Sequence, residues 1–247
     1  MTAFAYYRLP YLHHAHYVAQ REGEPEVLSS VAELNGKKGF VIAPFSPSGD
    51  CPVLLIHPDE SKLLPISDAK VISISDSTQA ENASDLDAYA EDFECFHQEL
   101  DKGTFRKIVL ARKATVRTAD KDFESLFMKA CRMYPRLFVS LVYTPQSGMW
   151  LMATPEILLK GEQGNMSTMS LAGTQKAEPS RTVADYPVEG VEWSHKNQEE
   201  QQYVTDYIED CIKAFADDYQ LKGPYTTMAA NLYHLRTDIS FRLRDEG

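Results

Sequence analysis

The segment LFVSLVYTPQSGMWLMATPEILLKG, residues 137–161, limits most strongly how this chain can fold. It contains two apolar runs of strand length. The residues between them include Pro145 and Gly148, which favour a turn. The segment therefore predicts a strand, a turn and a second strand.

Helix-like and strand-like segments are mixed along the rest of the chain, with no regular βαβ alternation. This mixing favours an α+β fold of largely antiparallel sheets flanked by helices over a doubly wound fold. In residues 105–116, FRKIVLARKATV, apolar side chains occupy both parities, which predicts a strand buried on both faces. The other expected strands are 38–47, 51–60, 166–175 and segments within 225–243, and the expected helices are 86–100, 122–135 and 196–216.

The third expected helix carries an apolar stripe that should face the core. The stripe consists of Val204, Ile208, Cys211 and Phe215. Cys95 and Cys211 fall in helical patterns, where we expect buried free thiols. The four cysteines are widely spaced and form no CxxC motif, so we expect a reducing compartment.

The charge of the chain restricts its partners. Lys and Arg number 25 and Asp and Glu number 36, which gives a net charge of −11 over 247 residues. So acidic a chain is a poor candidate for binding nucleic acid or an anionic membrane surface. The longest apolar runs are too short to span a bilayer, and no leader pattern opens the sequence, so we expect a cytoplasmic protein.

Lys107 is the first residue that could carry chemistry, since it directly precedes the apolar run Ile108–Ala111. Desolvation lowers the pKa of a lysine because the charged form loses hydration, and a neutral lysine can act as a general base. The simpler alternative is a lysine at a strand end that extends into solvent.

Two carboxylates are further candidates. Glu156 lies between an apolar stretch and Ile157–Leu159, where a raised pKa would suit a general acid, although it could be a turn residue after Pro155. Glu200 lies one turn before Val204 on the inner face of the third helix, where a carboxylate requires a metal ion, a cation or a proton. An acid favoured by the helix dipole is the alternative for Glu200.

The motif LAGT, which contains Ala172, Gly173 and Thr174, could hold an anion. Glycine allows a backbone N–H to approach an anion closely, and threonine adds a hydroxyl donor. A strand-ending turn would explain the same letters. His234, in YHLRT, is either a site residue or a histidine satisfied within the core.

The order of the motifs resembles the chorismate-utilising enzymes. FRKIVLAR, ATPEILL, LAGT, KNQEEQQYV and HLRT follow one another between Phe105 and Leu243. The resemblance implies the fold of anthranilate synthase component I and one chorismate-binding domain over residues 1–247. Residues 1–100 would be its variable N-terminal half and residues 101–247 its motif-bearing half.

Within this family the resemblance is greatest to isochorismate synthase. Members that use ammonia typically have glutamine at the position of Lys107, and aminodeoxychorismate synthases often have lysine at the position of Ala172. The resemblance implies Mg²⁺ as cofactor and Glu200 as a ligand to it. Lys107 would activate water for attack at C2 of chorismate, and Glu156 would protonate the departing C4 hydroxyl.

The remaining roles come from the same resemblance. Gly173 and Thr174, beside Ala172, would hold a substrate carboxylate, and His234 would lie near the ring carboxylate. The family normally continues beyond HLRTDISFRL with a glycine-rich segment and a further magnesium-binding glutamate, so we expect this chain to be truncated. Salicylate synthase and a non-catalytic chorismate-binding fragment stay open as alternatives. The sequence also leaves open whether the product would feed a menaquinone or a siderophore pathway, and which oligomeric state the protein has.

Overall fold

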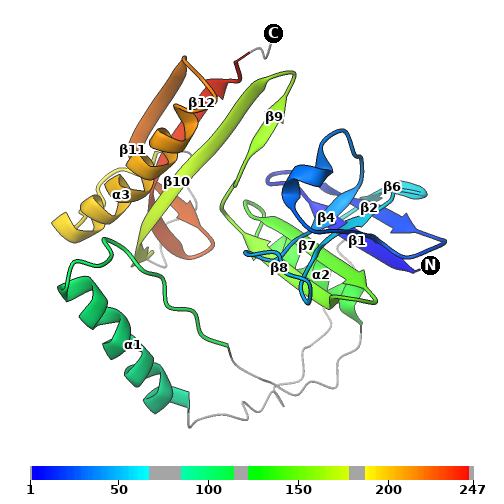
Figure 1. The fold of residues 1–247 in the computed structure, drawn as a ribbon, viewed down its shortest axis with the longest axis horizontal. Coiled ribbons are helices and arrows are strands. Elements are labelled where there is room, and N and C mark those ends of the chain that lie inside the picture. Colours follow the sequence, from blue (N-terminus) through cyan, green and yellow to red (C-terminus); the bar gives the residue numbers. More distant parts are fainter. Residues whose placement is uncertain (1, 67–84, 114–121, 178–186, 245–247) are drawn as a thin grey trace. The chain divides into compact units, whose positions relative to one another are not determined.

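The computed structural model describes residues 2–66, 85–113, 122–177 and 187–244 (Figure 1). The chain divides into two compact units. The first comprises Met1–Ser73 and Asp122–Pro155, and the second comprises Ile74–Lys121 and Glu156–Gly247. Each unit contains antiparallel sheet and a packed helix, so the predicted α+β class is confirmed. The assignment of one domain divided near residue 100 stays a prediction.

The first unit is built on a five-stranded sheet in the order β6-β2-β1-β7-β8. Its strands are β1 (Ala3–Arg8), β2 (His14–Gln20), β6 (Glu60–Pro65), β7 (Phe138–Thr144) and β8 (Gly148–Thr154). Strands β7 and β8 form the predicted hairpin, in which Thr144 pairs with Gly148. A small sheet of β3 (Glu26–Leu28), β5 (Val53–Ile56) and β4 (Phe40–Ile42) follows, with the 3-10 helix η1 (Val31–Leu34) between β3 and β4.

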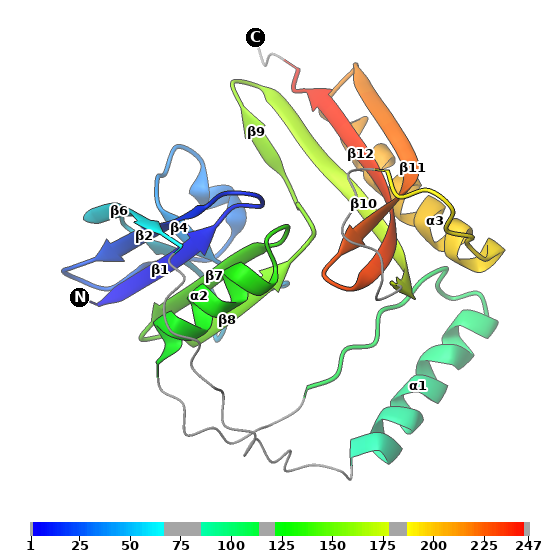
Figure 2. The same cartoon turned by 180° about the vertical axis from the view of Figure 1, so that it is seen from behind.

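Helix α2 (Phe123–Met133) packs on β7 and covers one face of the five-stranded sheet (Figure 2). The Asp122 side chain caps its N-terminus by accepting a hydrogen bond from the backbone N–H of Ser125. Phe127, Met128 and Cys131 form its buried face. The predicted helix over residues 122–135 is therefore confirmed.

Arg8, at the end of β1, is buried to 1% exposure beside the C-terminus of α2. Its guanidinium donates hydrogen bonds to the carbonyl oxygens of Tyr134 and Pro135. Hydrogen bonds from a charged donor are stronger than neutral ones, and these two satisfy carbonyls beyond the last helical turn.

We expect Arg8→Met to lower the free energy of unfolding by about 3 kcal/mol, because two part-buried backbone carbonyls lose a charged donor. Urea denaturation would measure the change. Arg21→Met is the control, since Arg21 pairs with Glu60 on the exposed surface and should change stability little. A fully stable Arg8→Met variant would mean that the desolvation cost of the guanidinium cancels its hydrogen bonds.

The second unit is built on a four-stranded sheet in the order β11-β12-β10-β9. Its strands are β9 (Lys160–Glu162), β10 (Asn165–Lys176), β11 (Tyr219–Ala229) and β12 (Leu232–Arg242). Helix α3 (His195–Ile212) lies along one face of this sheet, against β10 and β12 (Figures 1 and 2). Helix α1 (Asp85–Asp101) belongs to the same unit and is largely exposed.

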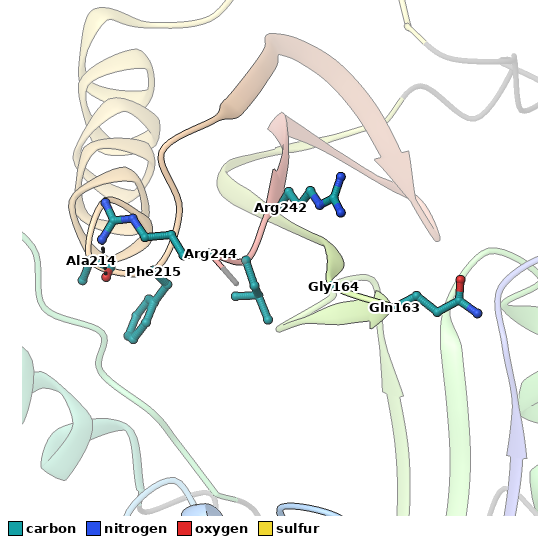
Figure 3. Close-up of a pocket in the computed structure, with 7 residues that line it drawn as sticks. Gln163, Gly164, Ala214, Phe215, Arg242 and Arg244 are labelled. Carbon is teal, nitrogen blue, oxygen red and sulfur yellow. Dashed lines mark hydrogen bonds between the residues drawn. The ribbon is translucent and has the colours of Figure 1, made fainter. Parts of the chain in front are cut away.

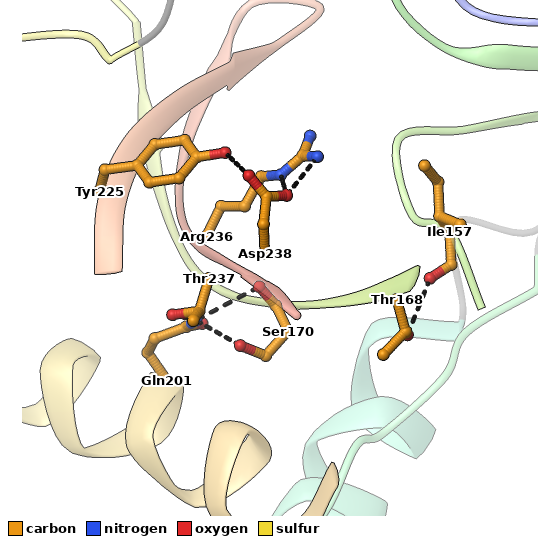
Figure 4. Close-up of polar contacts among 8 residues, drawn as sticks. All are labelled: Ile157, Thr168, Ser170, Gln201, Tyr225, Arg236, Thr237 and Asp238. Atoms are coloured by element: carbon orange, nitrogen blue, oxygen red, sulfur yellow. Dashed lines mark hydrogen bonds and ion pairs between the residues drawn. The ribbon is translucent and has the colours of Figure 1, made fainter. Parts of the chain in front are cut away.

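The expected apolar stripe of α3 is wrong in part. Gln201, Thr205 and Ile212 are the buried residues of this helix, Val204 and Ile208 are partly buried, and Cys211 and Phe215 are exposed. The reason is that α3 meets polar groups of the sheet. The Gln201 Nε2 atom donates to the Ser170 Oγ and Thr237 Oγ1 atoms, at 2.8 and 3.2 Å (Figure 4). Cys95 is exposed as well, so the expectation of buried thiols at Cys95 and Cys211 is wrong.

The strand expected over residues 105–116 is also wrong where the structure describes it. Residues 105–113 belong to no helix or strand, and Val109 is 75% exposed; residues 114–116 lie outside the described residues. A strand needs a neighbour for its backbone N–H and C=O groups. No described strand pairs with residues 105–113, so the apolar pattern alone does not produce a strand.

Candidate functional site

Lys107 and Glu200 form an ion pair in the second unit. The Lys107 Nζ atom lies 3.0 Å from the Glu200 Oε1 atom, and the two side chains are 29% and 32% exposed. Next to this pair, the guanidinium of Arg106 lies over the ring of Tyr203, 5.8 Å from its centroid. Glu200 and Tyr203 are one turn apart on α3, so two adjacent contacts hold residues 106 and 107 to this helix.

Gly173, Thr174 and His234 form a second group at a bulge in β10. The register between β10 and β12 shifts between Ala172 and Gln175, and Gly173 has a φ of +67°. The His234 Nδ1 atom lies 2.9 Å from the Gly173 carbonyl oxygen and 3.4 Å from the Thr174 Oγ1 atom. Since the carbonyl oxygen can only accept, Nδ1 carries the hydrogen, and the Nε2 atom is left for another partner.

Ala172 lies beside this group but faces inward. It pairs with Leu235 of β12 and is buried. Its small side chain therefore borders the bulge without extending from it.

The bulge and the ion pair meet through the start of α3. A Cβ atom added at Gly173 would lie 3.4 Å from the Cβ atom of Asn197, which precedes Glu200 by three residues on the helix. Residues three apart on a helix share a face. The structure therefore brings Lys107 and Glu200 within about one helical turn of the Gly173 bulge.

Glu156 lies elsewhere in the unit, on an apolar groove of about 540 Å³. The groove lies between the segment that begins at Glu156, the first half of β10 and the second half of α3. Its α3 lining starts at Tyr207, seven residues beyond Glu200, which is roughly 10 Å along the helix. The Thr168 hydroxyl donates to the Leu158 carbonyl oxygen at 2.7 Å and fixes one wall of this groove.

A second cavity, of about 670 Å³, adjoins the C-terminal end of α3 (Figure 3). Arg244 donates to the carbonyl oxygens of Lys213 and Ala214 and to the carboxylate of Asp217, so it caps the helix end. Arg242 lines the same cavity and points away from Arg244 (Figure 3). None of the residues predicted for the site lies here.

The described residues do not by themselves form a magnesium site. Within residues 2–66, 85–113, 122–177 and 187–244, no three His, Cys, Asp or Glu side chains are grouped to hold a metal ion. The candidate ligand Glu200 pairs with Lys107, and the neighbouring Glu199 pairs with His195 at 3.2 Å. One carboxylate can serve Mg²⁺ only if other oxygen ligands are supplied.

Two residues at this site were not found from the sequence. Trp193 packs against Gly173, and Arg106 contacts Tyr203. Trp193 directly precedes Ser194, whose side chain caps α3 by accepting from the N–H of Asn197. A large apolar residue just before an N-cap serine often packs at the start of a helix, and that signal was available in the sequence.

Comparisons with known proteins give one family match. The family described as chorismate binding enzyme matches residues 58–246. No curated protein matches the sequence.

Across the described parts of the chain, no helix has the length and apolar character needed to cross a membrane.

The solved structures with a similar fold include two proteins. One is a Bacillus anthracis protein assigned as the 2,3-dihydroxybenzoate-specific isochorismate synthase DhbC, with a TM-score of 0.71 and 14% identity over 98% of this chain and 68% of that one. The other is MenF, the menaquinone-specific isochorismate synthase of Escherichia coli, with a TM-score of 0.71 and 15% identity over 99% of this chain and 65% of that one. The chain thus spans about two thirds of the length of these proteins. At such identities the likeness concerns the fold alone.

Proposed function

Because the chain belongs to the chorismate binding enzyme family, we propose that it acts on chorismate and converts it to isochorismate. The observation that carries this proposal is the position of Lys107. Its amine pairs with Glu200 and so lies within about one helical turn of the Gly173 bulge. The likeness in fold to two isochorismate synthases supports the choice of reaction.

The proposed reaction is balanced by one water. Lys107, as the neutral amine, takes a proton from water while the oxygen of that water bonds to C2 of chorismate. The double bonds shift, the C4–O bond breaks, and Glu156 gives its proton to the leaving hydroxyl, which departs as water. One water enters and one leaves, so the product is an isomer of the substrate.

The ion pair with Glu200 bears on the first step. A carboxylate at 3.0 Å pairs with an ammonium group, whereas only the neutral amine can accept a proton from water. Lys107 must therefore lose its proton and separate from Glu200 before it can act as a base.

The Gly173 bulge supports binding of a substrate carboxylate. The Thr174 side chain is exposed and carries a hydroxyl donor. His234, held by the Gly173 carbonyl, can offer its Nε2 atom to the same anion when the ring is protonated. These groups would let an acidic protein bind an anionic substrate locally.

The experiment that tests the proposal is incubation of the protein with chorismate and Mg²⁺, followed by chromatography of the products. Isochorismate is the expected product. Pyruvate with salicylate would assign the protein as a salicylate synthase instead. Chorismate binding in calorimetry without any product would identify a binding protein without turnover.

Magnesium stays part of the proposal, with Glu200 as its one candidate ligand, and the steps above use only side chains of this chain. If Mg²⁺ uses Glu200, it must displace Lys107 from the carboxylate. We expect Lys107→Met to bind Mg²⁺ about tenfold more tightly, because a positive charge near a divalent cation costs on the order of 1–2 kcal/mol even in water. Calorimetric titration with MgCl₂ alone would measure this.

Lys102→Met is the matched control for this titration, since Lys102 forms a similar pair with Glu99 at 2.7 Å. Its affinity for Mg²⁺ should equal that of the unmodified protein. Equal affinity in Lys107→Met would remove Glu200 from the metal site.

A further inference from the structure

Trp193 is the side chain packed most closely against the Gly173 bulge. A Cβ atom added at Gly173 would lie 3.1 Å from the Trp193 Cζ3 atom, a distance that only a few Cβ contacts reach. The indole ring therefore lies directly against the glycine backbone. Because Gly173 has a φ of +67°, the bulge has a conformation that other residues rarely adopt.

The indole also reaches a second strand. Its Nε1 atom donates to the Thr226 Oγ1 atom on β11 at 2.9 Å. Thr226 is buried and pairs with Leu235 of β12, the residue next to His234. The ring thus links the bulge in β10 to β11, on the other side of β12.

Hydrogen bonds hold the backbone around Trp193 on both sides. The Gln175 side chain, just past the bulge, donates to the Glu192 carbonyl oxygen at 2.8 Å. The Gln198 side chain on α3 donates to the Trp193 carbonyl oxygen at 3.0 Å. The ring also packs on a buried apolar cluster of Ala177, Val188, Met228 and Tyr233. Trp193 is therefore a fixed support for the bulge.

We propose that Trp193 is a positioning residue that holds the Gly173–Thr174 bulge in the shape that binds the anionic group of the substrate. This inference rests on the proposed function. The link to the site is the Gly173 carbonyl oxygen, which accepts from His234 Nδ1 at 2.9 Å. Displacement of the Gly173 backbone would rotate both the Thr174 hydroxyl and the His234 ring away from a bound carboxylate.

The proposal predicts a change in KM rather than in kcat. Trp193→Ala should raise KM for chorismate by roughly tenfold or more while kcat stays within about threefold, since the bulge binds and does not react. Thr226→Val, which removes only the hydrogen-bond acceptor, should raise KM by about fivefold at most. Trp193→Phe keeps an aromatic ring, so it should raise KM less than Trp193→Ala does.

Trp150→Ala is the matched control, because the Trp150 indole also donates to an oxygen, the Ser147 carbonyl at 2.8 Å, but lies on β8 and is 53% exposed. Its KM should be unchanged. An unchanged KM in Trp193→Ala, with kcat reduced only by the fraction of unfolded protein, would show a purely structural role and overturn the proposal.

A second measurement does not depend on turnover. The chain has two tryptophans, so Trp150→Phe leaves Trp193 as the single indole. Its fluorescence should change and saturate on titration with chorismate, and Thr174→Val should weaken that response. Absence of any fluorescence change while isochorismate forms would overturn the inference and leave the proposed function intact. A saturating change without product would instead support the inference and contradict the isochorismate synthase reaction.

Discussion

Lys107→Ala is expected to lower kcat for isochorismate formation by roughly a thousandfold, because general base catalysis contributes about 10²–10⁴ in rate and alanine cannot accept a proton. The fold should persist, since Lys107 lies outside the helices and strands and is partly exposed. The assay is chorismate consumption with chromatographic identification of the product. Circular dichroism of the variant verifies that the helices and sheets remain.

Lys102→Ala controls for the loss of an ion pair with a glutamate. Lys102 pairs with Glu99 near the end of α1, far in sequence from Glu200, and its loss should leave kcat unchanged. A Lys107→Ala protein with the rate of the unmodified protein would exclude this lysine as the base. Another group would then have to activate the water.

Glu156→Gln is expected to reduce kcat by about 10²–10³, because glutamine has nearly the shape of glutamic acid but has no proton to give to the leaving hydroxyl. The apolar groove around Glu156 should keep its shape in this variant. Product formation at saturating chorismate would measure the effect. The matched control is Glu162→Gln, an exposed carboxylate on β9 of the same unit.

The position of Glu156 in the structure makes this variant a strict test of its role as the acid. Glu156 lines a groove whose α3 residues begin about two turns beyond Glu200. A proton donor has to reach the C4 oxygen while Lys107 acts at C2 of the same ring. An unimpaired Glu156→Gln variant would therefore mean that Glu156 only lines the groove.

Most of the regular elements could be predicted from the sequence. The hairpin of β7 and β8 follows from two apolar runs with Pro145 and Gly148 between them, and α2 follows from the spacing of Phe127 and Cys131. Such patterns are local, and each element also finds its partner within the same unit. Residues 105–113 have the apolar pattern of a strand but pair with none of the described strands. The pattern of one segment does not show whether another strand will lie beside it.

The sequence grouped several candidate site residues but did not give their contacts, and their roles stay predictions. The resemblance grouped Gly173, Thr174 and His234, which the structure does bring together at a bulge. The pairing of Lys107 with Glu200 could not be read from the sequence, because it depends on how residues 106 and 107 lie against α3. The apolar stripe expected for α3 is wrong in part, because the Thr205 hydroxyl and the Gln201 amide on this helix meet the polar Ser170 side chain on the sheet.

The buried amide of Gln201 affects how closely the orientation of α3 is fixed against the sheet. A helix that packs by methyl groups alone can slide or rotate slightly at small cost, since apolar contacts have little directional preference. Helix α3 cannot do so, because its Gln201 side chain must stay opposite Ser170 and Thr237 or lose its hydrogen bonds in a buried place. The amide therefore fixes the rotation of α3 about its own axis. Glu200 directly precedes Gln201 in the chain, so the direction in which it leaves the helix is fixed as well, although Glu200 itself needs no contact with the sheet.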